Sequence, residues 1–126
     1  MRDDLLAGRR VLIVEDEYFL AEDLRAALID VGVEVIGPAP SVEEALALIV
    51  AAPMIDAAVL DVNLRGDLVF PVADALHARA VPFVFASGYD RGSIPTRFAD
   101  VPNVRKPLQP RSIASVLHPL LRPEPC

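Results

Sequence analysis

Five short apolar runs alternate along this 126-residue chain with longer segments whose apolar residues recur at helical spacing. Most of the runs are continuous rather than alternating in polarity, which is typical of strands that are covered on both faces. A chain of this length forms one domain around one core. The pattern therefore predicts an α/β fold, a doubly wound five-stranded parallel sheet with helices on both faces. The runs are VLIV (11–14), VEVIG (33–37), AAVLDV (57–62), VPFVFAS (81–87) and NVR (103–105).

Helix signals fill the intervals between the first three runs. Residues 17–31 repeat apolar side chains at intervals of three and four, and Gly32 ends this predicted helix. Ser41 and Glu44 form a capping box that opens a second helix, which Pro53 ends.

The later helices differ in the strength of their signals. One helix is predicted over about 68–79, and the last begins after Pro110, a residue suited to a first helical turn. The segment RGSIPTRFAD (91–100) should hold the fourth helix, but glycine, serine and proline crowd it. We expect that helix to be short or mobile. A single domain over 1–126 is expected, with its core at about 10–121 and no output domain.

Charge and cysteine content disfavour several classes of partner and site. The formal net charge is -6, and both nucleic acid and an anionic membrane surface favour a basic protein face. No signal peptide and no membrane-spanning run is recognisable in the sequence. The single cysteine, Cys126, allows neither a disulfide within the chain nor a zinc knuckle. A cytoplasmic protein is expected.

Ionisable and polar side chains come at the ends of the apolar runs. The first run is followed by Glu15 and Asp16, the third contains Asp61, the fourth ends in Ser87, and the fifth is followed by Lys106. The carboxyl ends of parallel strands meet at one edge of a sheet, so these side chains are expected in one cleft. Each residue alone is more typical of a cap, a turn or a solvated surface. Their occurrence together indicates a site.

Three carboxylates in one cleft need a counter-charge. At about 5 Å and an effective dielectric of about 20, each ionised pair costs roughly 3 kcal/mol. A hard divalent cation removes that cost, and an oxygen-only set of ligands favours Mg²⁺ over zinc. Asp61 can then act as a nucleophile on phosphorus, while Lys106 and the Ser87 hydroxyl contact phosphoryl oxygens. The sequence therefore predicts a Mg²⁺-dependent phosphoryl acceptor.

These motifs resemble those of the response-regulator receiver family of two-component signalling. VLIVEDE (11–17) is similar to the family's first strand and acidic pair, and AAVLDVNLRG (57–66) to its phosphoacceptor strand and loop. FASG (85–88) is similar to its hydroxyl-bearing strand end, and RKPL (105–108) to its lysine–proline step. The resemblance covers about residues 10–121. It implies a (βα)5 flavodoxin-like receiver fold with strand order 2-1-3-4-5.

The resemblance also implies a role for each residue of the acidic cluster. It makes Asp61 both the phosphoacceptor and a ligand of Mg²⁺. Asp16 would bind the metal directly and Glu15 mostly through water. Asn63, two residues after the acceptor, would contribute its backbone carbonyl.

For the phosphoryl group, the resemblance implies an ion pair with Lys106, whose peptide bond to Pro107 is cis in the family. It implies a hydrogen bond from Ser87, which would shift upon phosphorylation while the 88–105 region changes conformation. Many receivers carry an aromatic residue three positions before the lysine. This chain has Asn103 there, which departs from the usual coupling between hydroxyl and aromatic residue.

The segment PFVFASGYD (82–90) is similar to the PFxFATGY signature of a subgroup of stand-alone receivers. That likeness implies a sensor histidine kinase of the HWE or HisKA-2 type as partner, and a downstream protein target or feedback onto the kinase. It makes Tyr89 and the stretch 88–99 a candidate output surface, although Tyr89 is as readily a half-buried packing aromatic. The loop after the acceptor, NLRGD (63–67), lacks the proline common in the family. A monomer or weak dimer is expected.

Two other classes of protein stay open. A docking module that works without phosphorylation would have a degenerate acidic site, whereas every acidic and basic position is filled here. Among enzymes, a haloacid-dehalogenase phosphatase needs a second Asp two residues after the nucleophile, where this chain has Asn63. A flavin binder needs a phosphate loop after the first strand, where this chain has the acidic EDEYF (15–19). A phosphoacceptor signalling protein is therefore expected rather than an enzyme.

Overall fold

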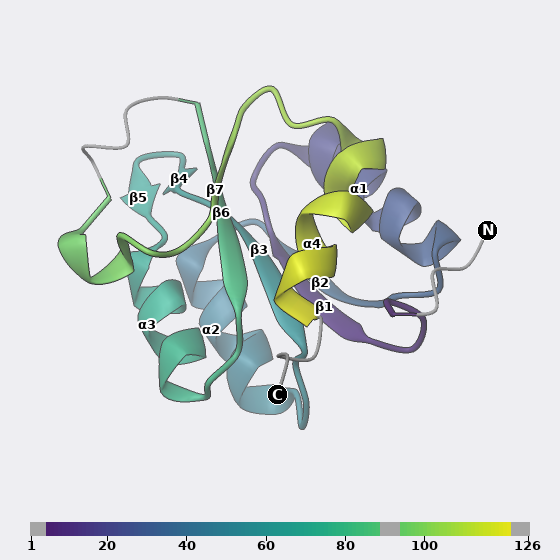
Figure 1. Cartoon of the computed structure of the whole chain (residues 1–126). Coiled ribbons are helices and arrows are strands. Elements are labelled where there is room, and N and C mark those ends of the chain that lie inside the picture. The colour runs from purple at the N-terminus through teal and green to yellow at the C-terminus, as the bar shows by residue number, and fades with distance from the viewer. Residues whose placement is uncertain (1–4, 89–93, 122–126) are drawn as a thin grey trace.

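A computed structural model describes residues 5–88 and 94–121. Five parallel strands form one sheet in the order β2-β1-β3-β6-β7 (Figure 1), which is the predicted order 2-1-3-4-5 when only the strands of this sheet are counted. Across the described residues, no helix has the length and apolar character needed to cross a bilayer. The strands are β1 (Arg10–Val14), β2 (Glu34–Ala39), β3 (Ala57–Asp61), β6 (Phe83–Ser87) and β7 (Asn103–Arg105).

Helices cover both faces of the sheet. Figure 1 shows α2 and α3 on one face and α1 and α4 on the other. The predicted capping box is present, because the Ser41 hydroxyl accepts a hydrogen bond from the Glu44 amide at 3.1 Å. A 3₁₀ turn, η3 (Pro110–Ser112), leads into α4. The helices are α1 (Tyr18–Asp30), α2 (Val42–Ala51), α3 (Phe70–Ala78) and α4 (Ile113–Leu121), close to their predicted positions.

Between the strands, one segment is short as expected and another has a structure that was not predicted. Within the described residues, the place of the fourth helix holds only a 3₁₀ turn, η2 (Thr96–Phe98), in line with its weak helix signal. The polar loop after β3 forms a small antiparallel hairpin, β4 (Asn63–Leu64) and β5 (Asp67–Leu68), which was not predicted. Each of its strands has two residues, too few for a period to be recognisable in the sequence.

Alternation along each strand divides the core into two clusters. In β1, Leu12 and Val14 pack with α2 and α3, whereas Val11 and Ile13 pack with α1 and α4. Successive side chains of a strand point to opposite faces, so this division extends to the residues just beyond each strand. It fixes the face on which each residue of the candidate site lies.

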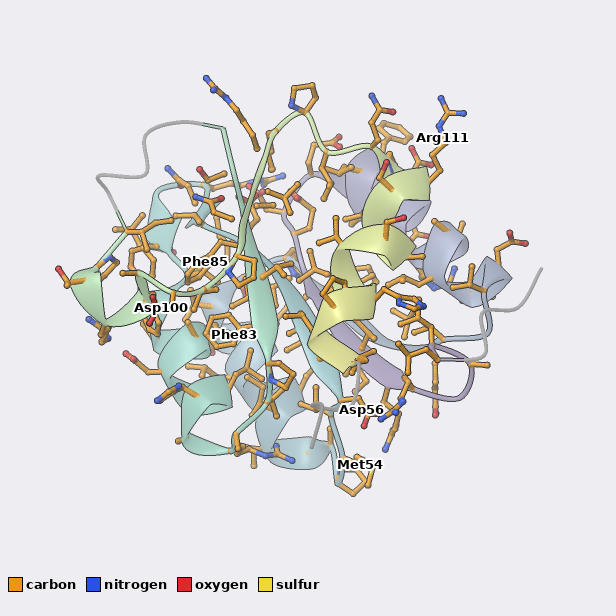
Figure 2. All side chains as sticks on the ribbon, in the orientation of Figure 1. Met54, Asp56, Phe83, Phe85, Asp100 and Arg111 are labelled. Carbon is orange, nitrogen blue, oxygen red and sulfur yellow. The ribbon has the colours of Figure 1, made fainter. Side chains whose placement is uncertain are left out.

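An aromatic group fills the α3 side of the core. Phe83 and Phe85 project from β6 toward that side (Figure 2). The Phe85 ring lies 5.5 to 5.8 Å from the rings of Phe70, Phe83 and Phe98, in edge-to-face geometry. Such pairs contribute beyond the area they bury. The cluster connects β6, α3 and η2.

A surface ion pair also joins η2 to α3. The Arg97 guanidinium makes two 2.9 Å hydrogen bonds to the Asp74 carboxylate. The same guanidinium lies 4.6 Å from the centre of the Phe98 ring, which is a cation–π contact. Arg97, through Asp74, and Phe98, through Phe70, therefore fasten the segment before β7 to α3.

Candidate functional site

The acidic cluster lies where three strands of the sheet end. Asp56 precedes β3 at the lower edge in Figure 2, so the carboxyl end of β3 lies at the opposite edge. Glu15 is two residues after Ile13, and Asp61 is two residues after Val59, on the face covered by α1 and α4. Lys106 has the same relation to Val104, which packs against that cluster. Strand alternation thus points all three charged side chains to one face.

Lys106 connects two of the carboxylates. Its Nζ lies 3.1 Å from Asp61 Oδ2 and 3.2 Å from Glu15 Oε1. Glu15, Asp16 and Asp61 each offer a carboxylate oxygen, and these atoms lie within 4.8 Å of one another. Residues separated by up to 91 positions in sequence (106 − 15) therefore form one compact group. The meeting of these residues at one sheet edge was predicted from the sequence.

The start of α1 orients the acidic pair. The Glu17 amide donates a 3.0 Å hydrogen bond to Glu15 Oε2, so the Glu15 carboxylate is bonded on both oxygens. The Glu15 residue is 3% exposed, whereas the Asp16 side chain is 16% exposed. Glu15 is therefore the inner acid of the pair and Asp16 the outer one.

The β4–β5 hairpin places Asn63 beside the cluster. The Asn63 amide donates to Asp61 Oδ1 at 3.3 Å, and the Asn63 side-chain oxygen accepts from the Gly66 amide at 2.6 Å. The Val69 amide donates to the Val62 carbonyl, so in the antiparallel ladder Asn63 has its own amide and carbonyl directed away from β5. The Asn63 carbonyl therefore faces the same side as its amide, which is the side of Asp61.

Burial shapes the titration of the cluster. It raises the pKa of Glu15 to about 7, with the neighbouring Asp61 adding to the shift and the Glu17 amide opposing it. Burial also raises the pKa of Asp61, although Lys106 acts to lower it. For Lys106, burial acts to lower the pKa, but the attraction of Asp61 and Glu15 raises it overall. Burial is therefore the main cause of both raised carboxyl pKa values, and the ion pairs with Lys106 act against it.

The donor set fits a divalent cation. Three carboxylates and a backbone carbonyl are the oxygen ligands that Mg²⁺ prefers in proteins. Burial disfavours the ionised forms of Glu15 and Asp61, as their raised pKa values indicate, and a bound cation would favour those ionised forms. Asp16, Asp61 and the Asn63 carbonyl are the residues that could hold it, with Glu15 behind them.

Five of the six residues predicted for the site line a cleft at this edge. Ser87 does not line that cleft. It is the last residue of β6 and is 8% exposed, and its neighbour Gly88 does line the cleft. The Ser87 carbonyl accepts a 2.9 Å hydrogen bond from the Lys106 amide. The cleft is lined by Glu15, Asp16, Glu17, Asp61, Asn63, Arg65, Gly88 and Lys106.

Other predictions near the site have separate outcomes. The Lys106–Pro107 peptide bond is cis, as the family resemblance implied. Asn103 occupies β7 with its side-chain oxygen buried and without a hydrogen-bond partner among the described residues. Tyr89 lies outside the described residues. Arg65 was not predicted, because its Nε lies 3.4 Å from Asp16 Oδ2 only by virtue of the hairpin.

No family model and no curated protein matches the chain, but solved structures do. The solution structure of SdrG from Sphingomonas melonis Fr1 is 41% identical, with a TM-score of 0.77 over 95% of this chain and 100% of SdrG. The BeF3-activated conformation of SdrG from Pseudomonas melonis Fr1 is 42% identical, with a TM-score of 0.69 over 92% of this chain and 98% of SdrG. The response regulator PhyR from Brucella abortus is 26% identical, with a TM-score of 0.76 over 92% of this chain and 49% of PhyR.

The sheet order and the acidic cleft define a receiver domain. With 41% identity over the whole length of SdrG, the chain belongs to the response-regulator receiver family. The fold class and the family inferred from the sequence are therefore confirmed.

The raised pKa of Glu15 predicts that Mg²⁺ binding releases protons. With a pKa of about 7, Glu15 is mostly protonated at pH 6 and mostly ionised at pH 8. A cation favours the ionised form, so the affinity for Mg²⁺ should rise about tenfold between these pH values. Calorimetric titration in two buffers of different ionisation enthalpy would measure the released protons. Glu15→Gln should remove most of this pH dependence, and an unchanged slope in that variant would contradict the assignment.

The same shift predicts how the metal-free protein responds to pH. The folded-state pKa of Glu15 lies above its ordinary value of 4.5, so its contribution to stability is full below pH 4.5 and is lost as the pH rises through 7. The loss is on the order of 3 kcal/mol. In EDTA, the free energy of unfolding of Glu15→Gln relative to wild type should therefore increase between pH 5 and pH 7.5.

Proposed function

We propose that this chain is a single-domain response regulator that accepts a phosphoryl group on Asp61 from a histidine kinase in a Mg²⁺-dependent reaction. The observation that carries the proposal is the bridge from Lys106 to both Asp61 and Glu15 within a group of three carboxylates. A structural ion pair needs one acid, whereas this group holds two acids more than its lysine can neutralise. Phosphoryl transfer requires such positioning and charge stabilisation and little further chemistry.

Phosphoryl transfer to Asp61 needs one bond to form and one to break. An Asp61 carboxylate oxygen attacks phosphorus in line, the O–P bond forms, and the P–N bond to the kinase histidine breaks. The histidine nitrogen keeps the electron pair of that bond and takes up a proton. Lys106, already 3.1 Å from Asp61, then pairs with a phosphoryl oxygen, and the Asn63 amide orients the carboxylate. When bound, Mg²⁺ would supply charge neutralisation of the phosphoryl oxygens.

The route from the site to the surface begins at Lys106. Its amide is bonded to the Ser87 carbonyl, so a shift of Lys106 acts on the end of β6 and the start of the 88–105 region. In that region, the described residues 94–105 hold only η2 and the short strand β7. A conformational change there would break few backbone hydrogen bonds, so its cost in free energy is low. We infer that this region carries the switch, with Ser87 as the phosphoryl-bonding hydroxyl.

The kinase partner is inferred to dock on α1 beside the cleft. Tyr18 and Phe19 are 68% and 73% exposed, and their rings are in contact at 5.4 Å. Phe19 and Lys106 line a common hollow. Exposed aromatics next to a reactive group are typical of an interface. The PFVFASGYD (82–90) segment supports a kinase of the HWE or HisKA-2 type.

Replacing Phe19 with Ala should slow phosphotransfer from the kinase without affecting the site itself. Loss of an exposed aromatic anchor is expected to lower the kcat/KM of transfer about tenfold. Autophosphorylation by acetyl phosphate, which needs no protein surface, should be unchanged. Val50→Ala, at an 88% exposed position on α2, is the matched control. Equal transfer rates for both variants would place the docking surface elsewhere.

The function as a whole is tested by phosphotransfer from purified histidine kinases, with radiolabelled phosphate, in Mg²⁺ and in EDTA. We expect rapid transfer from at least one kinase in Mg²⁺ and none in EDTA. The absence of labelling from any kinase and from acetyl phosphate would favour the docking module that works without phosphorylation. The proposed partners downstream are a separate protein target or the kinase itself.

A further inference from the structure

Arg65 has a backbone conformation that side-chain-bearing residues seldom adopt. The hairpin between β4 and β5 has a two-residue loop, Arg65–Gly66, and both residues have positive φ, 54° and 96°. Two positive φ values mark the turn type that favours Asn or Asp followed by Gly. An arginine here is disfavoured by its side chain, because L-residues avoid the left-handed region. A residue kept in such a conformation points to a role beyond closing the turn.

The left-handed conformation places the Arg65 guanidinium at the cleft. Its Nε lies 3.4 Å from Asp16 Oδ2, and Arg65 lines the cleft together with Asp61 and Lys106. The arginine side chain is 81% exposed, whereas that of Asp16 is 16% exposed. The contact is therefore made from the solvent side, by a group that is free to leave.

The two basic residues at the cleft divide the three acids between them. Lys106, which is 24% exposed, pairs with Glu15 and Asp61, and Arg65, which is 81% exposed, pairs with Asp16. With the acids ionised, three negative charges and Lys106 leave a net charge of about −2, which one divalent cation matches. Arg65 reduces that charge to about −1 and pairs with Asp16, the outer of the two adjacent acids. A cation that binds Asp16 must therefore displace the guanidinium.

We propose that Arg65 is a displaceable counter-ion of the metal site, which neutralises Asp16 in the metal-free protein and competes with the divalent cation for it. The inference rests on the proposed function, because it assumes that Mg²⁺ binds at this acidic cluster. Its consequence is that Arg65 sets the Mg²⁺ concentration at which the protein becomes competent for phosphorylation. Arg65 is thus a positioning residue that acts through Asp16.

The test is Mg²⁺ binding to Arg65→Asn. Asparagine suits the left-handed position, so the hairpin is retained while the charge is removed. The control is Arg105→Asn, which changes the net charge equally at an exposed position whose side chain points to the opposite face from Lys106. Binding is followed by amide chemical shifts of Asn63 and Gly66, with MgCl₂ alone as the ligand at low ionic strength.

Arg65→Asn should bind Mg²⁺ about threefold to tenfold more tightly than wild type, and Arg105→Asn should bind like wild type. Added KCl should reduce the difference, because the arginine contact is exposed to solvent. Arg65→Lys, which keeps the charge, should restore an affinity close to that of wild type. Equal affinities of Arg65→Asn and Arg105→Asn would overturn the inference and leave the proposed function standing. The absence of saturable binding in every protein would overturn both.

Discussion

Replacing Asp61 with Asn should abolish phosphoryl labelling by kinase or acetyl phosphate and make the metal-free protein more stable. The carboxamide has no nucleophilic oxygen for phosphorus, so the acceptor is lost. Its single side-chain oxygen can replace only one of the two acceptors, because Lys106 bonds Oδ2 of Asp61 and the Asn63 amide bonds Oδ1. Lys106 keeps its ion pair with Glu15, so the fold around the site should persist. The variant thus separates the chemistry of the acceptor from its place in the fold.

The gain in stability follows from the direction of the pKa shift. Burial raises the pKa of Asp61, so at neutral pH the folded state holds an ionised carboxylate less readily than the unfolded state does. Its contribution to stability is therefore lost as the pH rises through the folded-state pKa. Removing the charge should increase the free energy of unfolding by about 1 to 2 kcal/mol at pH 7.5 in EDTA. Added Mg²⁺ should reduce or reverse the difference, because wild type gains more from the cation.

The matched control for this experiment is Asp67→Asn. Asp67 is an exposed residue of β5, six positions from Asp61 and in the same hairpin region, and its replacement changes the net charge equally. Its labelling and its unfolding in EDTA should resemble those of wild type. Retained labelling of Asp61→Asn at the wild-type rate would show that another residue is the acceptor.

Most of this site could be predicted from the sequence because, in a strand, the spacing between two residues determines whether their side chains point to the same face. Ile13, Val59 and Val104 are buried on one face, and the charged residues two positions further on follow them to that face. The run pattern alone predicted a five-stranded parallel sheet and the meeting of Glu15, Asp61 and Lys106 at one edge, whereas the strand order came from the family resemblance. The continuous apolar runs predict a sheet covered by helices on both faces, and the residues at the carboxyl ends of those runs predict the site.

The features that were not predicted depend on contacts that leave no periodic pattern in the sequence. Arg65 reaches Asp16 because two adjacent residues adopt positive φ in a hairpin too short to leave a pattern. Asn63 itself was predicted for the site, but the contact of its side chain was not: its oxygen accepts a hydrogen bond from the Gly66 amide and closes the hairpin, while its backbone amide donates to Asp61. Both contacts depend on the folded backbone of the hairpin.

Replacing Phe85 with Ala should cause the largest loss of stability among the changes considered. Phe85 is fully buried in the central part of the sheet, and its ring contacts those of Phe70, Phe83 and Phe98. Truncating a buried phenylalanine costs about 3 to 5 kcal/mol, from lost transfer free energy and the cavity that remains. A domain of this size has about 5 to 15 kcal/mol in total, so a substantial part of it should be lost.

Urea unfolding of Phe85→Ala, Phe85→Leu and Tyr18→Ala measures this loss and its cause. The leucine variant keeps much of the volume and should lose about 1 to 2 kcal/mol. Tyr18→Ala removes an aromatic that is 68% exposed and should change the free energy of unfolding by less than about 0.5 kcal/mol. Phe85 lies on the face of the sheet away from Asp61, so the folded fraction of Phe85→Ala should still be labelled. A loss as small as that of Tyr18→Ala would mean that the four rings do not form one packed unit.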